Sequence, residues 1–377
     1  MGPSVGVERV RGQLEGLGAA GLDLPTFTRG ALEVLRRAMP FDAACLATVD
    51  PATELLTCAV KWGNLDDAHD LAWARHEYEV DDVYDFKSVL RSPGLVAGLH
   101  TETGGDVARS PRFSELFRPV WDFSDEMRAG IRVDGASWGG IALFHEGRRT
   151  FSHADQAFVS SLMPLLGRGL RAAVVSGAAA ALEVAVDGPA VVVVDADDAV
   201  TQANVGAAAR IADLGGGPLG ESRLPACLET LVAAARRFAA GGSTSAPRIR
   251  LRTLGGRWVV AHASPLLAVG GPPGGVVLTI EEARPPEIVP LLVAAHGLTA
   301  RERDVVTHVL AGTSTTDIAA AMHLSTWTVQ DHLKKVFEKM GVRSRRELVA
   351  RVNTDHYVPR LVAGDGVAPS GWFTDPA

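Results

Sequence analysis

The stretch Leu324-Ser-Thr-Trp-Thr-Val-Gln-Asp-His-Leu-Lys-Lys335 decides the fold of the C-terminal part of the chain. Ser325 can cap a helix, because its hydroxyl accepts a hydrogen bond from a free N–H group of the first turn. The helix that follows has one apolar stripe at helical spacing, formed by Val329, Leu333, Val336 and Met340. Its opposite face carries Trp327, Gln330, Asp331, Lys334 and Glu338, and the helix ends at Gly341. The pattern predicts a helix that is buried on one side and offers polar groups on the other.

Two further helices are predicted directly before this one. Thr299 and Glu302 form a Thr-x-x-Glu capping box, so a helix should begin at about residue 300. Ser314 and Asp317 form a second, weaker box, and a tight turn follows at residues 323–324. Two helices joined by a short turn, the second with an outward polar face, are typical of a helix-turn-helix. The second helix of that motif lies in the major groove of DNA.

Residues 298–349 resemble the LuxR/FixJ-type helix-turn-helix domain of bacterial transcription regulators. The resemblance has no gaps and rests on Leu298-Thr299-x-Arg301-Glu302, Gly312, Ile318-Ala319, Leu324-Ser325, Thr328-Val329, His332, Lys339-Met340-Gly341-Val342-Arg343-Ser344-Arg345 and Glu347-Leu348. In this family the third helix contacts bases, and a fourth helix can form a dimer contact. The resemblance therefore implies an all-α four-helix DNA-binding domain, for which we set the bounds at residues 291–352.

The same resemblance implies which side chains meet double-stranded DNA. Gln330, Asp331 and Lys334 take the base-facing positions. The backbone-facing positions are Thr316, Thr328, Lys335 and Arg345, and the expected DNA-binding set is completed by Trp327 and Arg343. The chain departs from the family at one place, since position 330 or 331 is commonly basic there. Gln can pair with adenine and Asp can accept from cytosine N4, but Asp331 also repels phosphate. We therefore expect modest affinity or an unusual specificity.

The distribution of charge supports this assignment. Residues 291–352 hold nine Lys/Arg and six Asp/Glu, whereas the whole chain has a formal net charge of −7. A basic module on an acidic body fits a DNA-binding head whose body is not attracted to DNA. A solvated helical surface of mixed charge would look similar, and the motif decides between the two interpretations.

Length and composition limit the rest of the chain. Its 377 residues, 47% of them hydrophobic, predict two to three domains with substantial cores. The N-terminus lacks the basic and apolar pattern of a signal peptide, and no apolar run approaches the roughly 20 residues that span a bilayer. Cys45, Cys58 and Cys227 lie far apart and form neither a metal site nor a disulfide framework. We expect a soluble cytoplasmic protein without metal, cofactor or membrane contact.

Residues 25–175 follow an N-terminal segment, residues 1–24, and predict one α/β domain. The expected order is helix, two strands, helix, a loop-rich middle over residues 81–122, two strands and a long helix. This order, with Trp138-Gly-Gly-Ile-Ala-Leu143 followed by Phe151-Ser-His-Ala-Asp155, resembles a GAF domain, a sensor module that binds small ligands or mediates dimer contacts. Candidates to line a ligand pocket are Trp62, Trp73, Trp121 and Trp138. Ordinary core aromatics are the interpretation that we favour for these four residues.

Residues 176–283 predict a second, smaller α/β segment with five strands. Its opening, residues 189–204, and its later strands resemble a PAS domain, and no His or Cys stands where a haem or flavin anchor would. Residues 284–290 contain three prolines and are expected to form an extended linker, whereas residues 353–377 are expected to be a flexible tail. Apolar residues at helical spacing over 155–187 predict either a signalling helix that pairs in a dimer or a helix that packs on its own domain.

Together these segments predict an α+β multidomain regulator, with GAF-like and PAS-like antiparallel-sheet sensor domains before the helix-turn-helix. A small-molecule effector or a partner would alter the placement of the DNA-binding heads, and RNA polymerase is a further candidate partner. We expect a homodimer, because two heads on a repeated half-site give the specificity that one head lacks. A ligand-free dimeric scaffold stays open as the alternative. An enzyme with a DNA-binding appendix is the least favoured class, since Gly-x-Ser-x-Gly, P-loop and His-Glu-x-x-His motifs are missing from the sequence.

Overall fold

The computed structural model describes residues 3–176, 188–243, 246–267 and 274–350. These residues form two compact units. The first contains two antiparallel sheets with their helices, and the second contains the helices from Pro285 onward. The predicted combination of two antiparallel sheets and a helical C-terminal part is confirmed. The expected tail, residues 353–377, and the last part of the predicted signalling helix, residues 177–187, lie outside the described residues.

Five strands make the first sheet, in the order β2-β1-β5-β4-β3, and every neighbouring pair is antiparallel. The strands are β1 (Ala43–Val49), β2 (Leu56–Trp62), β3 (Val96–Gly98), β4 (Phe123–Val133) and β5 (Ala136–Glu146). A two-residue turn at Asp134 and Gly135 joins β4 to β5, and both residues have positive φ. This conformation is the one that an Asp-Gly pair favours in a hairpin.

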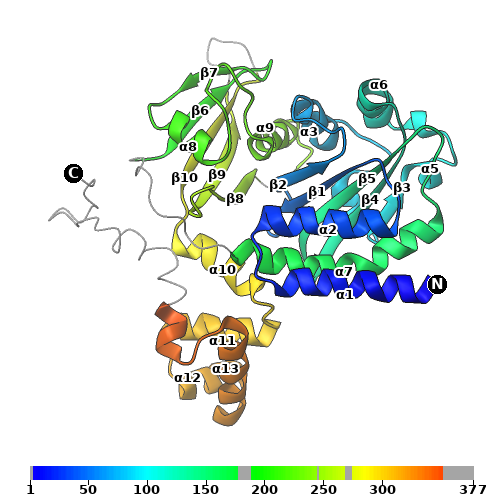
Figure 1. Cartoon of the computed structure of the whole chain (residues 1–377). Coiled ribbons are helices and arrows are strands. Elements are labelled where there is room, and N and C mark those ends of the chain that lie inside the picture. The colour runs from blue at the N-terminus through cyan, green and yellow to red at the C-terminus, as the bar shows by residue number, and fades with distance from the viewer. Residues whose placement is uncertain (1–2, 177–187, 244–245, 268–273, 351–377) are drawn as a thin grey trace. The chain divides into compact units, whose positions relative to one another are not determined.

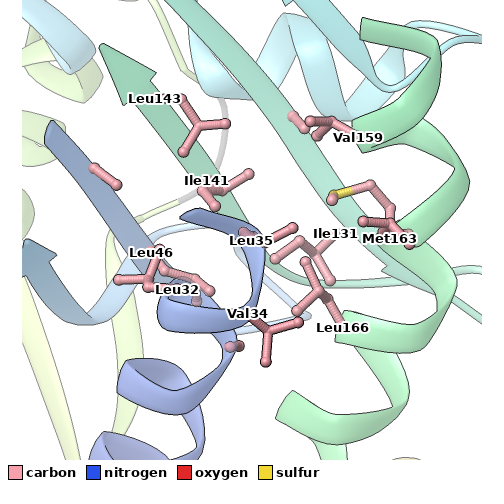
Figure 2. Close-up of a cluster of buried hydrophobic side chains, with 14 of the residues drawn as sticks. Leu32, Val34, Leu35, Leu46, Ile131, Ile141, Leu143, Val159, Met163 and Leu166 are labelled. Carbon is pink, nitrogen blue, oxygen red and sulfur yellow. The ribbon is translucent and has the colours of Figure 1, made fainter. Parts of the chain in front are cut away.

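One face of this sheet is covered by three helices, α1 (Pro3–Ala19), α2 (Leu24–Ala38) and α7 (His153–Val175) (Figure 1). Figure 2 shows the apolar core beneath them, to which Leu35 of α2, Ile141 of β5 and Leu166 of α7 contribute. Among the described residues, α7 is the one helix long and apolar enough to cross a membrane, but it packs against α1 and β4, and 50% of its most apolar window is buried. Residues 153–175 therefore pack on their own domain.

The opposite face of the first sheet is covered by short helical segments. They are α3 (Asp70–Tyr78), α4 (Phe86–Arg91), α5 (Leu99–Glu102), the 3₁₀ turn η1 (Val107–Arg109), the π-helical turn η2 (Phe113–Phe117) and α6 (Arg118–Trp121). The prediction of a loop-rich middle over residues 81–122 is wrong, because five of these helical segments lie within it. Segments this short hold too few apolar positions for a helical period to show, and tertiary burial of Phe113, Leu116 and Phe117 stabilises them instead.

The second sheet has the strand order β7-β6-β10-β9-β8. Its strands lie close to the predicted positions: β6 (Ala190–Val194), β7 (Val200–Ala203), β8 (Arg248–Arg252), β9 (Trp258–Pro265) and β10 (Val276–Glu282). Asn204, directly after β7, accepts a 3.0 Å hydrogen bond from the Val191 N–H and donates one of 2.8 Å to the Pro189 carbonyl. The helices that follow are α8 (Ala207–Asp213) and α9 (Ala226–Ala239). α9 buries Leu228 and Leu231 in the core of this sheet.

A helix, α10 (Pro285–Ala295), replaces the extended linker predicted for residues 284–290. That prediction is wrong because two of the three prolines occupy the first helical positions, where an N–H has no helical partner and the fixed φ is already helical. Pro290 lies inside the helix and forgoes one backbone hydrogen bond. The Arg284 N–H donates to the Glu287 carboxylate over 2.7 Å, which satisfies a donor at the helix start.

Candidate nucleic-acid interface and ligand cavity

Three helices build the predicted helix-turn-helix region, α11 (Ala300–Leu310), α12 (Thr315–Met322) and α13 (Thr326–Met340). The capping box at the start of α11 is confirmed. The Glu302 N–H donates to Thr299 Oγ1 over 3.3 Å, and the Thr299 N–H donates to Glu302 Oε2 over 2.8 Å. Lys339 of α13 donates to the same carboxylate oxygen over 2.7 Å, so this carboxylate also ties α11 to α13.

The turn between α12 and α13 is set by two local features. His323 ends α12 in the left-handed conformation, with φ 55°. Ser325 Oγ accepts a 3.0 Å hydrogen bond from the Thr328 N–H and lies 2.8 Å from Thr328 Oγ1. The predicted cap at Ser325 is therefore confirmed. Because both ends of the turn are satisfied locally, the direction in which α13 leaves α12 is fixed.

The two faces of α13 differ as predicted. The apolar stripe Val329, Leu333, Val336 and Met340 is buried in the core of the second unit. On the opposite face Gln330, Lys334 and Lys335 are exposed, and the side chain of Trp327 is 75% exposed. A helix that is buried on one face and exposed on the other can enter a major groove with its exposed face.

Asp331 is paired on this face. Lys335 Nζ lies 2.8 Å from Asp331 Oδ2, one helical turn away. The hydrogen bond from Lys335 lowers the pKa of Asp331, and the same bond raises the pKa of Lys335. The pairing offsets part of the repulsion that Asp331 would exert on phosphate.

The remaining predicted DNA-binding residues fall into two groups. Thr316 on α12 and Arg343 after α13 are exposed. Arg345 is half-buried, and its guanidinium donates a hydrogen bond to the Thr313 carbonyl, so it links the helical residues 345–350 to the turn before α12. The Thr328 hydroxyl is engaged in the cap of α13. Thr328 and Arg345 therefore have a structural role besides their predicted backbone-facing positions.

Five charged side chains that sequence reasoning missed form a buried ion cluster in the first unit. Glu126 on β4 accepts from Arg112 over 2.8 Å and from Arg128 over 2.7 Å. Arg112 also reaches Asp82 at 3.2 Å, and Arg128 reaches Glu77 at 2.6 Å. Burial raises the pKa of Glu126, but the two guanidinium groups outweigh it and hold that pKa below its usual value. The five residues are spread over positions 77–128, and no local sequence pattern indicates that they meet.

A cavity lies between α3 and the sheet strands β1, β2 and β5. Its walls are mainly apolar and include Ala47, Val49, Leu56, Ala59, Trp73, Ala74, Phe86 and Leu90. Ala226 and Thr230 of α9 contribute to the lining as well. At Gly140 on β5 a Cβ atom would lie 2.4 Å from the Phe86 ring, so glycine is needed for Phe86 to lie against the strand.

The charged residues of this lining already have partners. They pair as Glu54 with Ser137, Lys61 with Asp67 and Asp70, and Glu77 with Arg128. The Lys61 ammonium group uses its three N–H donors on the Asp66 carbonyl at 2.6 Å, on Asp67 at 2.8 Å and on Asp70. A molecule in the cavity would therefore meet apolar surface and charged groups that already have hydrogen-bond partners.

The four candidate tryptophans do not all line this cavity. Trp73 lines the cavity and makes edge contacts with Phe117 and Phe144. The other three lie elsewhere: Trp62 packs on Phe41 and under Arg36, Trp121 stacks on Phe123, and Trp138 is buried. Of the four candidates Trp73 alone lines this cavity, because tertiary packing and not sequence proximity decides which ring faces it.

A search among known families matches residues 296–352 to "Bacterial regulatory proteins, luxR family". The C-terminal part of the chain is therefore a LuxR-family helix-turn-helix domain. No curated protein matches the chain.

Several solved structures resemble the chain at low identity. The free methionine-R-sulfoxide reductase of Neisseria meningitidis in complex with its substrate is 18% identical over 44% of this chain and 89% of that chain, with a TM-score of 0.33. The Vibrio cholerae VqmA–ligand–DNA complex is 20% identical over 45% and 82%, with a TM-score of 0.24. Escherichia coli SdiA is 9% identical over 91% and 92%, with a TM-score of 0.28. TM-scores this low do not establish a shared overall fold or function.

Proposed function

We propose that the chain is a sequence-specific transcriptional regulator that binds double-stranded DNA as a homodimer through α13. Its first unit, with GAF-like and PAS-like sensor parts, responds to a small molecule and controls the DNA-binding heads. The observation that carries the proposal is the arrangement of α13 in a LuxR-family domain. Its apolar stripe is buried in the core, and its polar face is exposed. Action by binding without catalysis, and a cytoplasmic location, belong to the same proposal.

Two neighbouring lysines separate base contact from backbone contact. Lys334→Ala is expected to weaken binding to the preferred site by about 1–3 kcal/mol and to reduce sequence preference, because its position faces the bases. Lys335→Ala is expected to weaken binding to all sequences alike, because it removes one phosphate contact. The slope of the logarithm of the binding constant against the logarithm of the salt concentration should become less steep by about one. Fluorescence anisotropy titrations on the preferred and a scrambled duplex, at several salt concentrations, measure both effects.

Arg37→Ala is the matched control for these titrations, since Arg37 is an exposed cation on α2, outside the DNA-binding domain. It should leave both affinities unchanged. If Lys334→Ala and Lys335→Ala bind the preferred site as the parent does, the placement of α13 in the groove is wrong.

The cavity is the proposed site of the effector, and its lining favours an uncharged, largely apolar molecule. A charged ligand would lose its hydration and find only carboxylates and an ammonium group that are already paired. α9 belongs to the second sheet, packs against α3 and β2, and contributes to the lining, so occupancy of the cavity can bias the position of α9. A shift in the position of α9 transmits a signal only if the ligand binds two arrangements of the protein with different affinities.

Toluene and its charged analogues test this ligand class. Toluene at ten times its Kd should stabilise the parent by about 1.4 kcal/mol, seen as a raised Tm, whereas benzoate and benzylammonium should give no shift. Ala74→Leu, which fills the cavity from α3, should abolish the toluene response, and Ala209→Leu on the exposed side of α8 should keep it. Equal shifts with the charged analogues would contradict the proposed ligand class, and an unchanged response of Ala74→Leu would contradict the proposed site. No shift with any of the three compounds would favour the ligand-free scaffold alternative.

A further inference from the structure

Trp327 is the large apolar side chain in the middle of an otherwise polar face. It lies in the first turn of α13, three and four positions before Gln330 and Asp331, and its side chain is 75% exposed. Neither the cap nor the core of the domain uses it. The cap is made by Ser325 and Thr328, and the buried stripe begins at Val329. The exposed indole of Trp327 therefore does not stabilise the domain through either its cap or its core.

A lone exposed apolar side chain needs no explanation on an ordinary surface, but the first turn of α13 is not an ordinary position. In a helix-turn-helix the N-terminal residues of the second helix face the base edges. The major groove displays donors and acceptors on every base pair, and its one apolar group is the C5-methyl of thymine. An indole at this place can bury apolar surface in the groove only against that methyl group.

We propose that Trp327 packs its indole ring against the C5-methyl of a thymine and so makes that thymine part of the recognised half-site. The inference rests on the proposed function, since it requires α13 in the major groove. Gln330 lies three residues further along α13, about 4.5 Å along the helix axis, whereas successive base pairs are about 3.4 Å apart. The thymine that Trp327 contacts therefore lies within one or two base steps of the adenine that pairs with Gln330.

Replacement of single thymines by deoxyuridine tests the proposal, because it removes the methyl group and keeps every hydrogen-bonding atom. The duplex is the one that the full-length protein prefers in binding-site selection from random DNA. One thymine in each half-site should be sensitive, and its replacement should weaken binding of the parent about threefold to tenfold, as expected for one buried methyl group. Trp327→Ala should bind the thymine and deoxyuridine duplexes equally. Trp327→Phe, which keeps a smaller apolar surface, should retain part of the difference. Circular dichroism checks that the variants fold, as the exposure of Trp327 leads us to expect.

The outcomes separate this inference from the proposed function. If the parent binds the selected duplex but no deoxyuridine replacement matters, the methyl contact is wrong while the DNA-binding function stands. The same holds if Trp327→Ala stays as sensitive to deoxyuridine as the parent, or if it loses affinity equally for both duplexes; the second result would place Trp327 against the sugar-phosphate backbone or another protein. If the folded parent prefers no duplex at all, the inference falls together with the proposed function.

Discussion

Replacement of Glu126 by alanine is expected to lower the free energy of unfolding of the first unit by about 3–5 kcal/mol. Glu126 is the centre of the buried ion cluster, and its carboxylate faces the guanidinium groups of Arg112 and Arg128, both fully buried. Alanine would leave two cations inside the protein with one carboxylate partner each, Asp82 for Arg112 and Glu77 for Arg128. The loss is large beside the roughly 5–15 kcal/mol by which natural domains are stable.

Urea unfolding followed by tryptophan fluorescence measures this loss, because Trp62, Trp73, Trp121 and Trp138 all lie in the first sheet region. The matched control is Glu33→Ala. Glu33 pairs with Arg37 at 3.5 Å on the surface, where both side chains are more than half exposed, so its removal should cost less than about 1 kcal/mol. Similar losses for the two variants would show that the buried cluster contributes no more than a surface pair.

Replacement of Glu229 by glutamine is expected to stabilise the protein above neutral pH. Glu229 on α9 is only 4% exposed, and its Oε2 atom has no hydrogen-bond partner among the described residues. Burial, with a further contribution from Asp70, raises the pKa of Glu229 from 4.5 to about 7. The folded protein therefore holds this proton more tightly than the unfolded chain does. The contribution of Glu229 to stability is therefore largest below pH 4.5, falls as the pH rises toward about 7, and stays lower above that value.

Glutamine cannot ionise, so Glu229→Gln should remove this loss. We expect a gain on the order of 1–3 kcal/mol at pH 8 and little change at pH 4, where both residues are uncharged. Urea unfolding of the parent and the variant at the two pH values measures the difference, with the exposed Glu33→Gln as the control. A variant that matches the parent at both pH values would mean that the Glu229 carboxylate is solvated in the folded state.

The sequence allows the second unit to be predicted better than the site in the first. The helices α11 and α13 are capped by Thr299 and Ser325 as predicted, because a capping serine or threonine and its N–H partner lie three residues apart and need no tertiary contact. The Lys335–Asp331 pair has the same local character and could have been found from its i, i+4 spacing. Apart from β3, which lies in the stretch predicted as loop-rich, the strands of both sheets were also predicted, since alternation and turn residues are local signals.

Other features depend on contacts between distant residues. Glu77 meets Arg128 across 51 positions of sequence, and nothing near either residue signals the pair. The same applies to the cavity, where α9, which the sequence reasoning did not predict, joins strands and helices far away in the chain. The prediction of an extended linker over residues 284–290 failed for a different reason. Proline disfavours a helix in its interior but favours one at the first position, so composition alone could not decide between a linker and a helix.

Binding-site selection with the purified full-length protein on random duplex DNA tests the central claim most directly. We predict enrichment of a repeated half-site in which a thymine lies within two base steps of an adenine, and a weaker enrichment with Lys334→Ala. The repeat would establish a dimer, and the sequence would report the contacts of Trp327 and Gln330 on α13. Failure of the folded protein to enrich any sequence would contradict the account that this chain is a sequence-specific DNA-binding regulator.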